Sequence, residues 1–269
     1  KIKPIIQRKN NLKYAEVNVD EKVISSPKNE HIKYLSKLKQ KKYRDEYKTY
    51  LIEGMKIISE AADAGEEIAY LIYDDRYKPA DIAAKYKLHV TQRIIKSLSS
   101  LDSPPGIIAA VKMRKSEPDL SGNNWILLDE IKDPSNAAAI VRSADCAGFA
   151  GVIFSNNSVD IYNEKFLRAA MGSNYHIALI NEDNAEENLE KFKNQGYNIY
   201  GASLEGKENF EIKNDKIVLV IGNESNGISK NALNQCDLLI KIPIYGRAES
   251  LNAACAASVL MYKLNGYIN

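Results

Sequence analysis

The second half of the chain repeats a single pattern, in which short apolar segments alternate with stretches of helical periodicity. The apolar segments are rich in Ile, Val and Leu and do not alternate with polar residues; they read WILLDE, GVIF, HIALI, YNIYGAS, KIVLVIGNE and LLIKIPIYG. Such strands are typical of a parallel sheet whose two faces are both covered by helices. The pattern therefore predicts an α/β domain with a mostly parallel sheet over residues 124–269.

The first half shows a shorter series of the same kind. Apolar segments within residues 49–112 alternate with helical stretches, one of them expected near 79–86, and predict a smaller α/β domain over residues 28–113. Residues 114–123 are polar and form the expected linker. Residues 1–27 show no clear periodicity and are expected to be an N-terminal extension, either an arm or an extra strand. A chain of 269 residues has room for two such domains.

The positive charge lies in the first half. Residues 1–120 hold 24 Lys and Arg against 17 Asp and Glu, a net charge of +7, whereas the remaining residues carry −5. Five basic residues recur at intervals that place them on one face of a helix within residues 29–48: Lys33, Lys37, Lys41, Arg44 and Lys48. Such a face is either solvated or bound to a polyanion, and the regional charge favours contact with RNA phosphates.

Composition disfavours several classes of protein. No apolar run approaches the roughly 20 residues that span a bilayer, and no apolar secretory segment is visible near the N-terminus, which favours a cytoplasmic location. Three widely separated cysteines indicate neither a disulfide framework nor a zinc site, and Cys146 and Cys255 are expected to be small core residues. With three isolated histidines, no metal site is expected. Most of the sixteen tyrosines follow the periodicity of strands and helices and are expected to be packing residues.

Three strand-to-loop junctions in the second half carry polar residues, and ligands of open parallel sheets bind at such junctions. The first junction lies in LLDEIKDPSNAAAIVRSADCAGF, where Asn136 is placed to cap a helix and Arg142 lies on that helix. A helix cap with a surface arginine is the ordinary alternative for this segment.

The second junction, VLVIGNESNGISK, covers residues 218–230. It contains Gly222, Glu224 and Gly227 before a helix that Ser229 is expected to cap. Two glycines allow the backbone to approach a ligand closely, but Ile228 and Ser229 follow Gly227 where a phosphate-binding loop has lysine and then Ser or Thr.

The third junction, IKIPIYGRAESLNAACAASVL, covers residues 240–260. Here a strand ends, and a helix begins at Ser250, Leu251 and Asn252. The first amide groups of that helix are therefore expected to face the same end of the sheet. A cap by Ser250 is the ordinary explanation.

In this order, the three segments resemble the three motifs of the SpoU/TrmH family, the RNA ribose 2′-O-methyltransferases of the SPOUT superfamily. The similarity rests on DPSNAAAIVRSADCAGFAGVIF, VLVIGNESNGIS and IPIYGRAESLNAACAASVLMYKL, with RAAMGSNYHI between the first two. In the first half, KYLSKLKQKKYRDEYKTYLIEGMKIISEA and SPPGIIAAV resemble the L30e-like substrate-binding domain of many members. The resemblance covers residues 28–265.

The resemblance implies a SPOUT domain with a trefoil knot and a mostly parallel sheet, preceded by the L30e-like domain. A knot is an exception to the rule that chains do not thread loops. The resemblance also implies S-adenosyl-L-methionine as cofactor and a homodimer formed through the C-terminal domain. The positions that match cofactor-binding residues are Gly222, Ile242 and Leu251, with Ser203 and Ile244 as neighbours. Those that match catalytic residues are Asn136, Arg142, Glu224, Ser250 and Asn252.

Two interpretations of Arg142 stay open. The family attributes removal of the ribose proton to the arginine at this position, but a guanidinium with a pKa above about 12 is badly matched to that role at neutral pH. Alternatively, Arg142 binds an RNA phosphate and stabilises charge that develops on the ribose oxygen. Glu224 then either pairs with Arg142 or caps the helix that follows.

Two positions depart from the family pattern. Ala138 and Ser225 stand where glycine is common. The methyl group of Ala138 could narrow an RNA or subunit contact, and Ser225 requires a backbone that accommodates a side chain.

The predicted function is methyl transfer from S-adenosylmethionine to a ribose 2′-hydroxyl of RNA. Ribosomal RNA of the 23S type is favoured over transfer RNA because of the basic first domain, and an in-line displacement needs alignment rather than a metal. A non-catalytic RNA-binding or ribosome-assembly protein with the same fold is the alternative from another class. An unrelated nucleotide-binding enzyme is disfavoured by the missing glycine-rich phosphate motifs.

Overall fold

The computed structural model describes residues 23–77, 82–114, 122–181, 185–212 and 216–267. The chain divides into two compact units, Lys1–Arg114 and Lys115–Asn269, each with its own sheet and core. Most of the expected N-terminal extension and of the expected linker lies outside the described residues. Within the described part of the chain, no helix is long and apolar enough to cross a membrane.

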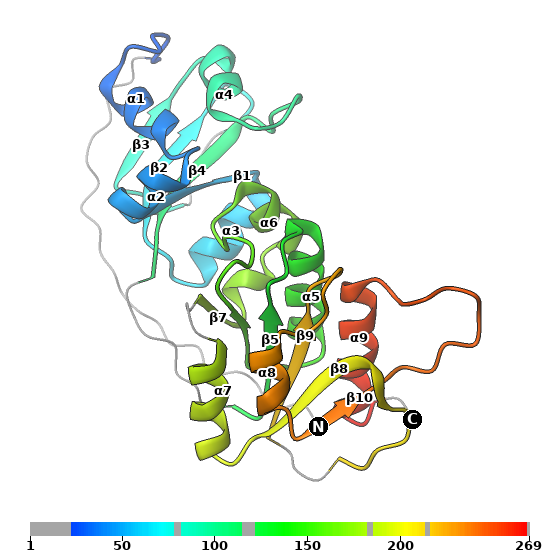
Figure 1. Cartoon of the computed structure of the whole chain (residues 1–269). Helices are drawn as coiled ribbons and strands as arrows, with labels where there is room; N and C mark the ends of the chain where they lie inside the picture. The colour runs from blue at the N-terminus through cyan, green and yellow to red at the C-terminus, as the bar shows by residue number, and fades with distance from the viewer. Residues whose placement is uncertain (1–22, 78–81, 115–121, 182–184, 213–215, 268–269) are drawn as a thin grey trace, which may run out of the picture. The chain divides into compact units, whose positions relative to one another are not determined.

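A four-stranded sheet forms the centre of the first unit (Figure 1). Its strands, in spatial order, are β1 (Thr49–Glu53), β4 (Ile107–Lys112), β2 (Ile68–Tyr73) and β3 (Tyr86–His89). β4 is antiparallel to both β1 and β2, whereas β2 and β3 are parallel. Ile24 forms an isolated parallel bridge with Val90 just beyond β3. The described end of the N-terminal extension therefore pairs with the edge of this sheet.

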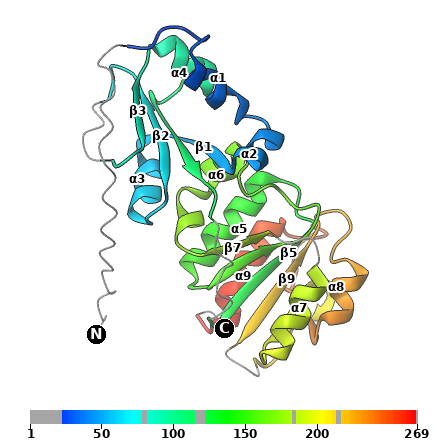
Figure 2. The same cartoon turned by 90° about the vertical axis from the view of Figure 1, so that its left-hand side faces the viewer.

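Helices cover both faces of this sheet (Figure 2). They are α1 (Glu30–Lys37), α2 (Lys41–Tyr47), α3 (Met55–Asp63) and α4 (Gln92–Leu98). α1 and α4 bury Ile32, Leu35, Ile94 and Ile95 in one cluster with residues of the strands. α3 packs against β1 and β4 from the opposite face. The first unit is therefore a small α/β domain, as the sequence predicted.

Two expectations for this unit are wrong. The basic stretch at 29–48 is not a single helix, because α1 ends at Lys37 and α2 begins only at Lys41. The helix expected near 79–86 does not form in its described part, where residues 82–84 are irregular and β3 begins at Tyr86. Pairing with β2 and burial against the core decide the structure there, and they outweigh the local periodicity.

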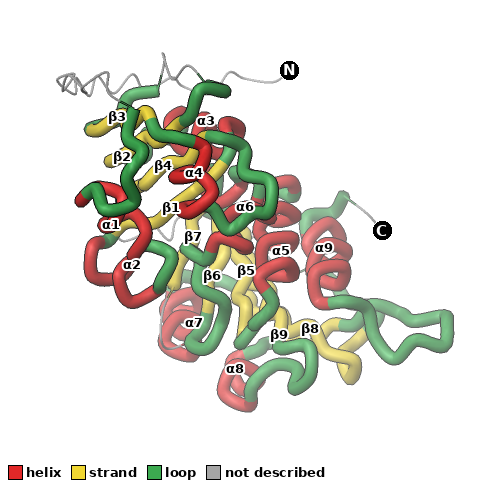
Figure 3. Tube along the Cα trace, turned by 90° about the horizontal axis from the view of Figure 1, so that it is seen from above, coloured by secondary structure: helices red, strands yellow, loops and turns green. Residues whose placement is uncertain are grey.

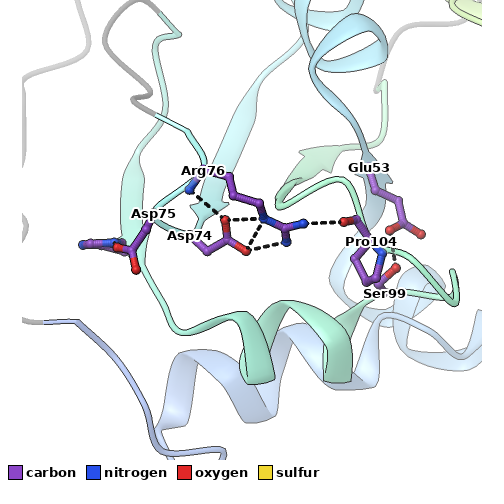
Figure 4. Close-up of polar contacts among 7 residues, drawn as sticks. Glu53, Asp74, Asp75, Arg76, Ser99 and Pro104 are labelled. Carbon is purple, nitrogen blue, oxygen red and sulfur yellow. Dashed lines mark hydrogen bonds and ion pairs between the residues drawn. The ribbon is translucent and has the colours of Figure 1, made fainter.

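An ion pair fixes the loop that precedes β4 (Figure 4). Arg76 donates from Nε and Nη2 to the carboxylate of Asp74, at 2.6 Å for the shortest contact, and from Nη1 to the carbonyl oxygen of Pro104. The Asp74 side chain is 0% exposed, and its hydrogen bonds with Arg76 hold its pKa below the usual range. A Cβ at Gly106 would lie 2.8 Å from Arg76, so the pair itself requires a glycine here.

The second unit contains a six-stranded sheet in which all neighbouring strands are parallel. In spatial order they are β10 (Leu238–Ile240), β8 (Asn198–Lys207), β9 (Ile217–Gly222), β5 (Asn124–Asp129), β6 (Gly151–Phe154) and β7 (Ala178–Asn181). The central strands β9, β5 and β6 are buried along almost their whole length. The prediction of a mostly parallel sheet covered on both faces is confirmed.

Helices enclose this sheet on two sides (Figure 3). They are α5 (Pro134–Cys146), α6 (Glu164–Ala170), the short 3-10 helix η1 (Ser173–Tyr175), α7 (Ala185–Asn194), α8 (Lys230–Gln235) and α9 (Ala253–Leu264). α5 packs against α6 and α9 on one face, and α7 packs against α8 on the other. Trp125 belongs to the core under α7 and α8, and an added Cβ at Gly151 would lie 2.3 Å from its ring. Gly151 is therefore required by the packing of Trp125.

The last helix, α9, is buried on one side only. α9 packs through Ala254, Ala257, Leu260, Met261 and Leu264, but Cys255 and Val259 on its other side are exposed. Cys146, at the end of α5, is exposed as well. The expectation that Cys146 and Cys255 are core residues is wrong, because each of these helices has packing partners on one side only. An apolar strip is left uncovered on this unit.

Candidate active site

The three junctions converge at one edge of the second sheet. β5 and β9 are adjacent and parallel, and their last residues, Asp129 and Gly222, lie opposite each other in register. β10, which leads into the third junction, is parallel to β8 on the other side of β9. All three loops therefore leave the sheet at the carboxyl ends of its strands, as the sequence predicted.

The side-chain amide of Asn136 joins the three loops. Its Nδ2 donates to Glu224 Oε1 at 2.7 Å, and its Oδ1 accepts from Asn252 Nδ2 at 3.0 Å. These bonds connect positions 88 and 116 residues apart in the chain. We call this row of three side chains the Asn136 network; it contains one predicted catalytic residue from each junction.

The helix caps at this edge differ from those expected, and the difference leaves Asn136 available for the network. Asp133 caps α5 in place of Asn136, and its carboxylate accepts from the backbone N–H of Asn136 at 2.8 Å. Asn252 caps α9 in place of Ser250. Asn252 thus uses Oδ1 for the cap and Nδ2 for Asn136. The cap of α8 by Ser229 is confirmed.

The loop after β9 closes on itself and presents Glu224. Asn223 and Gly227 exchange backbone hydrogen bonds at 3.0 and 2.9 Å, and Asn223 Oδ1 accepts from the N–H of Ser225. Gly222 must be glycine, because an added Cβ would lie 2.2 Å from the backbone of Gly227. The packing of its own loop therefore requires glycine at position 222, and the close approach to a ligand that the sequence suggested stays a prediction.

A buried carboxylate that the sequence analysis missed supports this loop. Asp129, 3% exposed at the end of β5, accepts from the backbone N–H of Ser229 at 2.6 Å. Asn223 Nδ2 donates to the carbonyl oxygen of Glu130, whose φ of 58° lies in the left-handed region. The end of β5 therefore holds both ends of the loop that carries Glu224. The available signal was a charged residue directly after the apolar run WILL.

A pocket of about 700 Å³ lies beside the Asn136 network. Its lining includes all five predicted cofactor-binding residues and three predicted catalytic residues: Ser203, Gly222, Ile242, Ile244, Leu251, Glu224, Ser250 and Asn252. Leu204 and Glu205, which the sequence analysis did not single out, belong to the same wall. The volume falls within the ~300–1,000 Å³ of typical small-molecule sites.

The segment between β10 and α9 contributes Lys241, Ile242, Ile244, Ser250, Leu251 and Asn252 to the pocket wall. Residues 241–252 have no regular secondary structure, and no backbone–backbone hydrogen bond among the described residues involves 242–251. The peptide groups of Ile242, Ile244, Ser250 and Leu251 are therefore available to a ligand. Leu251 and Ile244 are 44% and 37% exposed, so this wall also presents apolar surface that a ligand would cover.

Arg142 lies on the exposed side of α5 and takes no part in the Asn136 network. No ion pair involves it in the part of the chain that the structure describes, and it does not line the pocket. Both alternatives considered for Glu224 are wrong: it bonds to Asn136 rather than Arg142, and Ser229 caps the next helix. The Arg142 guanidinium is left open to solvent.

The two departures from the family pattern are accommodated. Ala138 is 0% exposed, so its methyl group packs inside the unit and does not narrow an RNA or subunit contact. Ser225 does not have a positive φ, so its backbone accepts a side chain without strain. Neither departure changes the Asn136 network.

Other reactive groups are not arranged for chemistry. No cluster of three or more metal-ligating side chains occurs among the described residues. Burial raises the pKa of the Cys236 thiol to about 11, and its Sγ donates to the carbonyl oxygen of Ala232. Cys236 is therefore a protonated, packed thiol at neutral pH rather than a nucleophile.

Arg44 does not belong to the basic surface that was expected in the first unit. Arg44 is 6% exposed and donates from Nη1 to the carbonyl oxygens of Leu38 and Lys39, so its prediction as an RNA contact is wrong. The break between α1 and α2 leaves carbonyl groups without helical partners, and Arg44 satisfies them. The other four predicted residues are exposed: Lys33, Lys37, Lys41 and Lys48.

Comparison with known protein families matches both units. The family described as SpoU rRNA Methylase matches residues 123–262, and the MRM3-like substrate binding domain matches residues 29–109.

Individual relatives are similar over almost the whole chain. The 23S rRNA (guanosine(2553)-2′-O)-methyltransferase RlmP of Bacillus subtilis (strain 168) is 34% identical over 248 residues, which cover 91% of this chain and 100% of the relative. The crystal structure of an AdoMet-bound rRNA methyltransferase from Sinorhizobium meliloti has a TM-score of 0.81 at 27% identity and covers 92% of this chain and 98% of that one. A solved RNA 2′-O ribose methyltransferase has a TM-score of 0.77 at 25% identity, over 90% and 98% of the two chains. The chain belongs to the SpoU rRNA methylase family.

Proposed function

We propose that this protein transfers a methyl group from S-adenosyl-L-methionine to a ribose 2′-hydroxyl of ribosomal RNA, of the 23S type. The observation that carries the proposal is the Asn136 network at the rim of the 700 Å³ pocket. It brings one polar side chain from each of three distant loops to the place where a small molecule fits. A relative named for 2′-O-methylation of 23S rRNA supports the same reaction.

The pocket suits S-adenosylmethionine in size and in chemistry. Ile242, Ile244 and Leu251 offer apolar surface to the adenine ring, and the peptide groups of these residues and of Ser250 offer donors and acceptors to its polar edges. A solved relative of the same fold is AdoMet-bound. When bound, S-adenosylmethionine would supply a methyl group on a positively charged sulfur. The ribose oxygen would gain this methyl group and release its proton to water, and the cofactor would remain as a neutral thioether.

The residues of this chain act by alignment. Asn136 fixes Glu224 relative to Asn252 before RNA arrives, so little reorganisation remains for the reaction step. Ser250 is exposed in the pocket lining and offers its hydroxyl to the incoming ribose. These residues therefore position the 2′-hydroxyl against the methyl donor.

Arg142 acts as an electrostatic clamp in this proposal. It is exposed and has no carboxylate partner among the described residues, so its guanidinium is available for two parallel hydrogen bonds to an RNA phosphate. A guanidinium stays protonated at neutral pH and cannot take up the ribose proton. Phosphate binding and stabilisation of negative charge are therefore the roles that its chemistry allows.

The first unit holds the RNA. Lys33, Lys37, Lys41 and Lys48 are exposed on or next to α1 and α2, in the half of the chain that carries a net charge of +7. Neutralising phosphates releases counterions and supplies affinity that does not depend on sequence. The choice of nucleotide then falls to the shape of the RNA and to the loops around the pocket.

Methyl incorporation from labelled S-adenosylmethionine into ribosomal RNA tests the proposal. The RNA comes from a strain that lacks this gene, so that the target ribose is unmodified. We expect incorporation with the native protein and a rate lower by about 10²–10³-fold with Asn136→Ala, which removes the link between the three loops. A folded protein that binds S-adenosylmethionine in calorimetry but transfers nothing to ribosomal or transfer RNA would instead favour a non-catalytic RNA-binding protein.

The proposal includes a homodimer formed through the second unit, acting in the cytoplasm where ribosomal RNA is modified. The exposed apolar strip of α9, with Cys255 and Val259, is a surface that a second copy would cover. Sedimentation should give twice the 30.1 kDa of one chain, and Val259→Glu should give the single chain. The trefoil knot stays a prediction.

A further inference from the structure

Six aromatic side chains of the first unit, from α1, α2, β2 and β3, form a continuous row. In spatial order they are Tyr43, Tyr47, Tyr34, Tyr70, Tyr86 and His31, with neighbouring ring centroids 4.7 to 6.0 Å apart. Two of the pairs are stacked, Tyr43 on Tyr47 at an interplanar angle of 20° and Tyr70 on Tyr86 at 23°. We call these six residues the aromatic row; it joins four elements that are separate in the sequence.

The aromatic row is anchored to the core but reaches the surface. All six residues are partly exposed. Tyr34, Tyr47, Tyr70 and Tyr86 pack against the apolar core of the first unit, whereas Tyr43 is not part of that core. Burial and the neighbouring tyrosines raise the pKa of Tyr70 to about 12, so its phenol carries no negative charge at physiological pH. The expectation that the tyrosines only pack therefore describes one side of these rings.

Lysines lie over Tyr43, at one end of the aromatic row, and over Tyr86, next to the other end. Lys37 and Lys42 place their Nζ atoms 5.3 and 5.8 Å from the ring centroid of Tyr43, and Lys85 Nζ lies 5.3 Å from that of Tyr86. Residues 30–48 contain six lysines against three acidic residues. The surface around the rings is therefore positively charged.

We propose that the aromatic row binds an unpaired stretch of the RNA substrate, with bases placed against the rings and phosphates against the lysines. The proposal rests on the proposed function, since it takes RNA as the partner, and it adds which form of RNA the first unit recognises. Base–aromatic stacking together with a basic surface is the usual means of holding single-stranded nucleic acid.

Unpaired RNA fits this surface better than an RNA duplex or an acidic peptide. The bases of a duplex are stacked on one another and offer no face to a tyrosine ring. An acidic peptide would satisfy the lysines but leave the rings without partners. An unpaired strand carries a flat base and a negative charge in every nucleotide, which matches rings and lysines that lie side by side.

The test compares two RNA probes on the full chain by fluorescence anisotropy: a short oligouridine, and an RNA duplex of similar length. Tyr43→Leu and Tyr86→Leu each remove one ring that lies under a lysine. We expect each to weaken binding of oligouridine by about 5- to 150-fold, the loss of one base–ring stack, and to leave duplex binding unchanged. Tyr43→Phe and Tyr43→Trp should restore the affinity, because each keeps an aromatic face.

Tyr73→Leu is the matched control. Tyr73 lies on the same strand as Tyr70 but three positions on, hence on the other face, where it stacks on His89 at 5.2 Å. It should bind both probes like the native protein. Unchanged oligouridine binding by Tyr43→Leu, or an equal loss for strand and duplex, overturns the proposal. Displacement of the RNA by an acidic peptide at equal concentration also overturns the proposal, because the surface would then recognise only the negative charge of its ligand.

Failure of this inference can be told apart from failure of the proposed function. If oligouridine binding depends on Tyr43 and Tyr86 but no ribosomal RNA is methylated, the RNA-binding role of the aromatic row is supported and the proposed enzymatic function is contradicted. If ribosomal RNA is methylated and Tyr43→Leu has the KM of the native protein, the function stands and the aromatic row falls.

Discussion

The two units each contain a polar network, and the two networks differ in exposure: one is enclosed and the other opens onto a pocket. In the first unit, Arg76 encloses the carboxylate of Asp74, which is 0% exposed, and Gly106 packs against the pair. In the second unit, the Asn136 network lies at the carboxyl edge of the sheet and opens onto a pocket of about 700 Å³. In the first network, Arg76 donates hydrogen bonds to both oxygens of the Asp74 carboxylate. In the second network, polar groups remain exposed to the pocket.

The difference shows how a structural network is distinguished from a functional one. A buried carboxylate without a partner is costly, so Asp74 must be enclosed for the fold to form. The Asn136 network is partly exposed, so water can replace each bond and the fold does not depend on it. We therefore expect changes in the first network to act on stability and changes in the second to act on turnover.

Asn136→Ala should give the largest effect. It removes both hydrogen bonds that join the three loops, and we expect kcat to fall by about 10²–10³-fold, as for the loss of a preorganised donor in an active site. The free energy of unfolding should hardly change. Asp133→Ala is the control, since it removes the cap of the same helix and should cost about 1 kcal/mol of stability with a smaller effect on kcat. Equal loss of stability in both variants would erase the contrast between the networks.

Arg142→Lys should have the next largest effect. Lysine keeps the charge but not the flat, forked donor, so turnover should fall by about 10- to 100-fold, the loss of one charge-assisted hydrogen bond. The measurement is kcat/KM for ribosomal RNA, with the Kd for S-adenosylmethionine as the control that should stay constant. Nearly full turnover would mean that a point charge is sufficient at this position.

Asp74→Asn should destabilise the protein without affecting turnover. It removes the charge that Arg76 encloses, and we expect the free energy of unfolding to fall by about 1–3 kcal/mol in urea titrations. Asp75→Asn is the matched control one position away, because the Asp75 side chain is 83% exposed and its contact with His89 is a surface pair. If the two variants are equally stable, enclosure of Asp74 contributes nothing.

The pH dependence of this effect has a definite sign. Hydrogen bonds with Arg76 lower the pKa of Asp74, so the carboxylate stabilises the folded state above its unfolded pKa of about 4. The contribution is lost as the pH falls through the lower, folded pKa. The difference in stability between the native protein and Asp74→Asn should therefore be constant near neutrality and shrink in acid. A difference that grows in acid would contradict the assignment.

The smallest effect concerns the three cysteines of the second unit. Cys146 and Cys255 are exposed, whereas burial raises the pKa of Cys236 to about 11. With a disulfide reagent at pH 8, two thiols should react rapidly and Cys236 slowly, because only the thiolate attacks. A homodimer that covers α9 should slow Cys255 as well, and dilution or Val259→Glu should restore its rate.

Much of the fold follows from local pattern. The continuous apolar runs of β5, β6 and β9 predict buried parallel strands, because neither face of such a strand carries polar side chains for water to contact. The cap of α8 by Ser229 is equally local, since it depends on a residue and the amide three positions later. The observed starts of α5 and α9 differ by a few residues from the predicted ones, so the predicted caps, Asn136 and Ser250, are not the side chains that cap these helices.

The sequence by itself determined the α/β class, the order of the three loops and the residue types that face the pocket. Only the tertiary structure decided that Asn136 bonds to Glu224 across 88 positions, that Arg44 is buried, and that separate tyrosines form one row. The physical reason is that periodicity and caps act over a few residues, whereas these contacts depend on where strands end and which elements become neighbours. The local sequence around such side chains therefore does not predict which of them will be in contact.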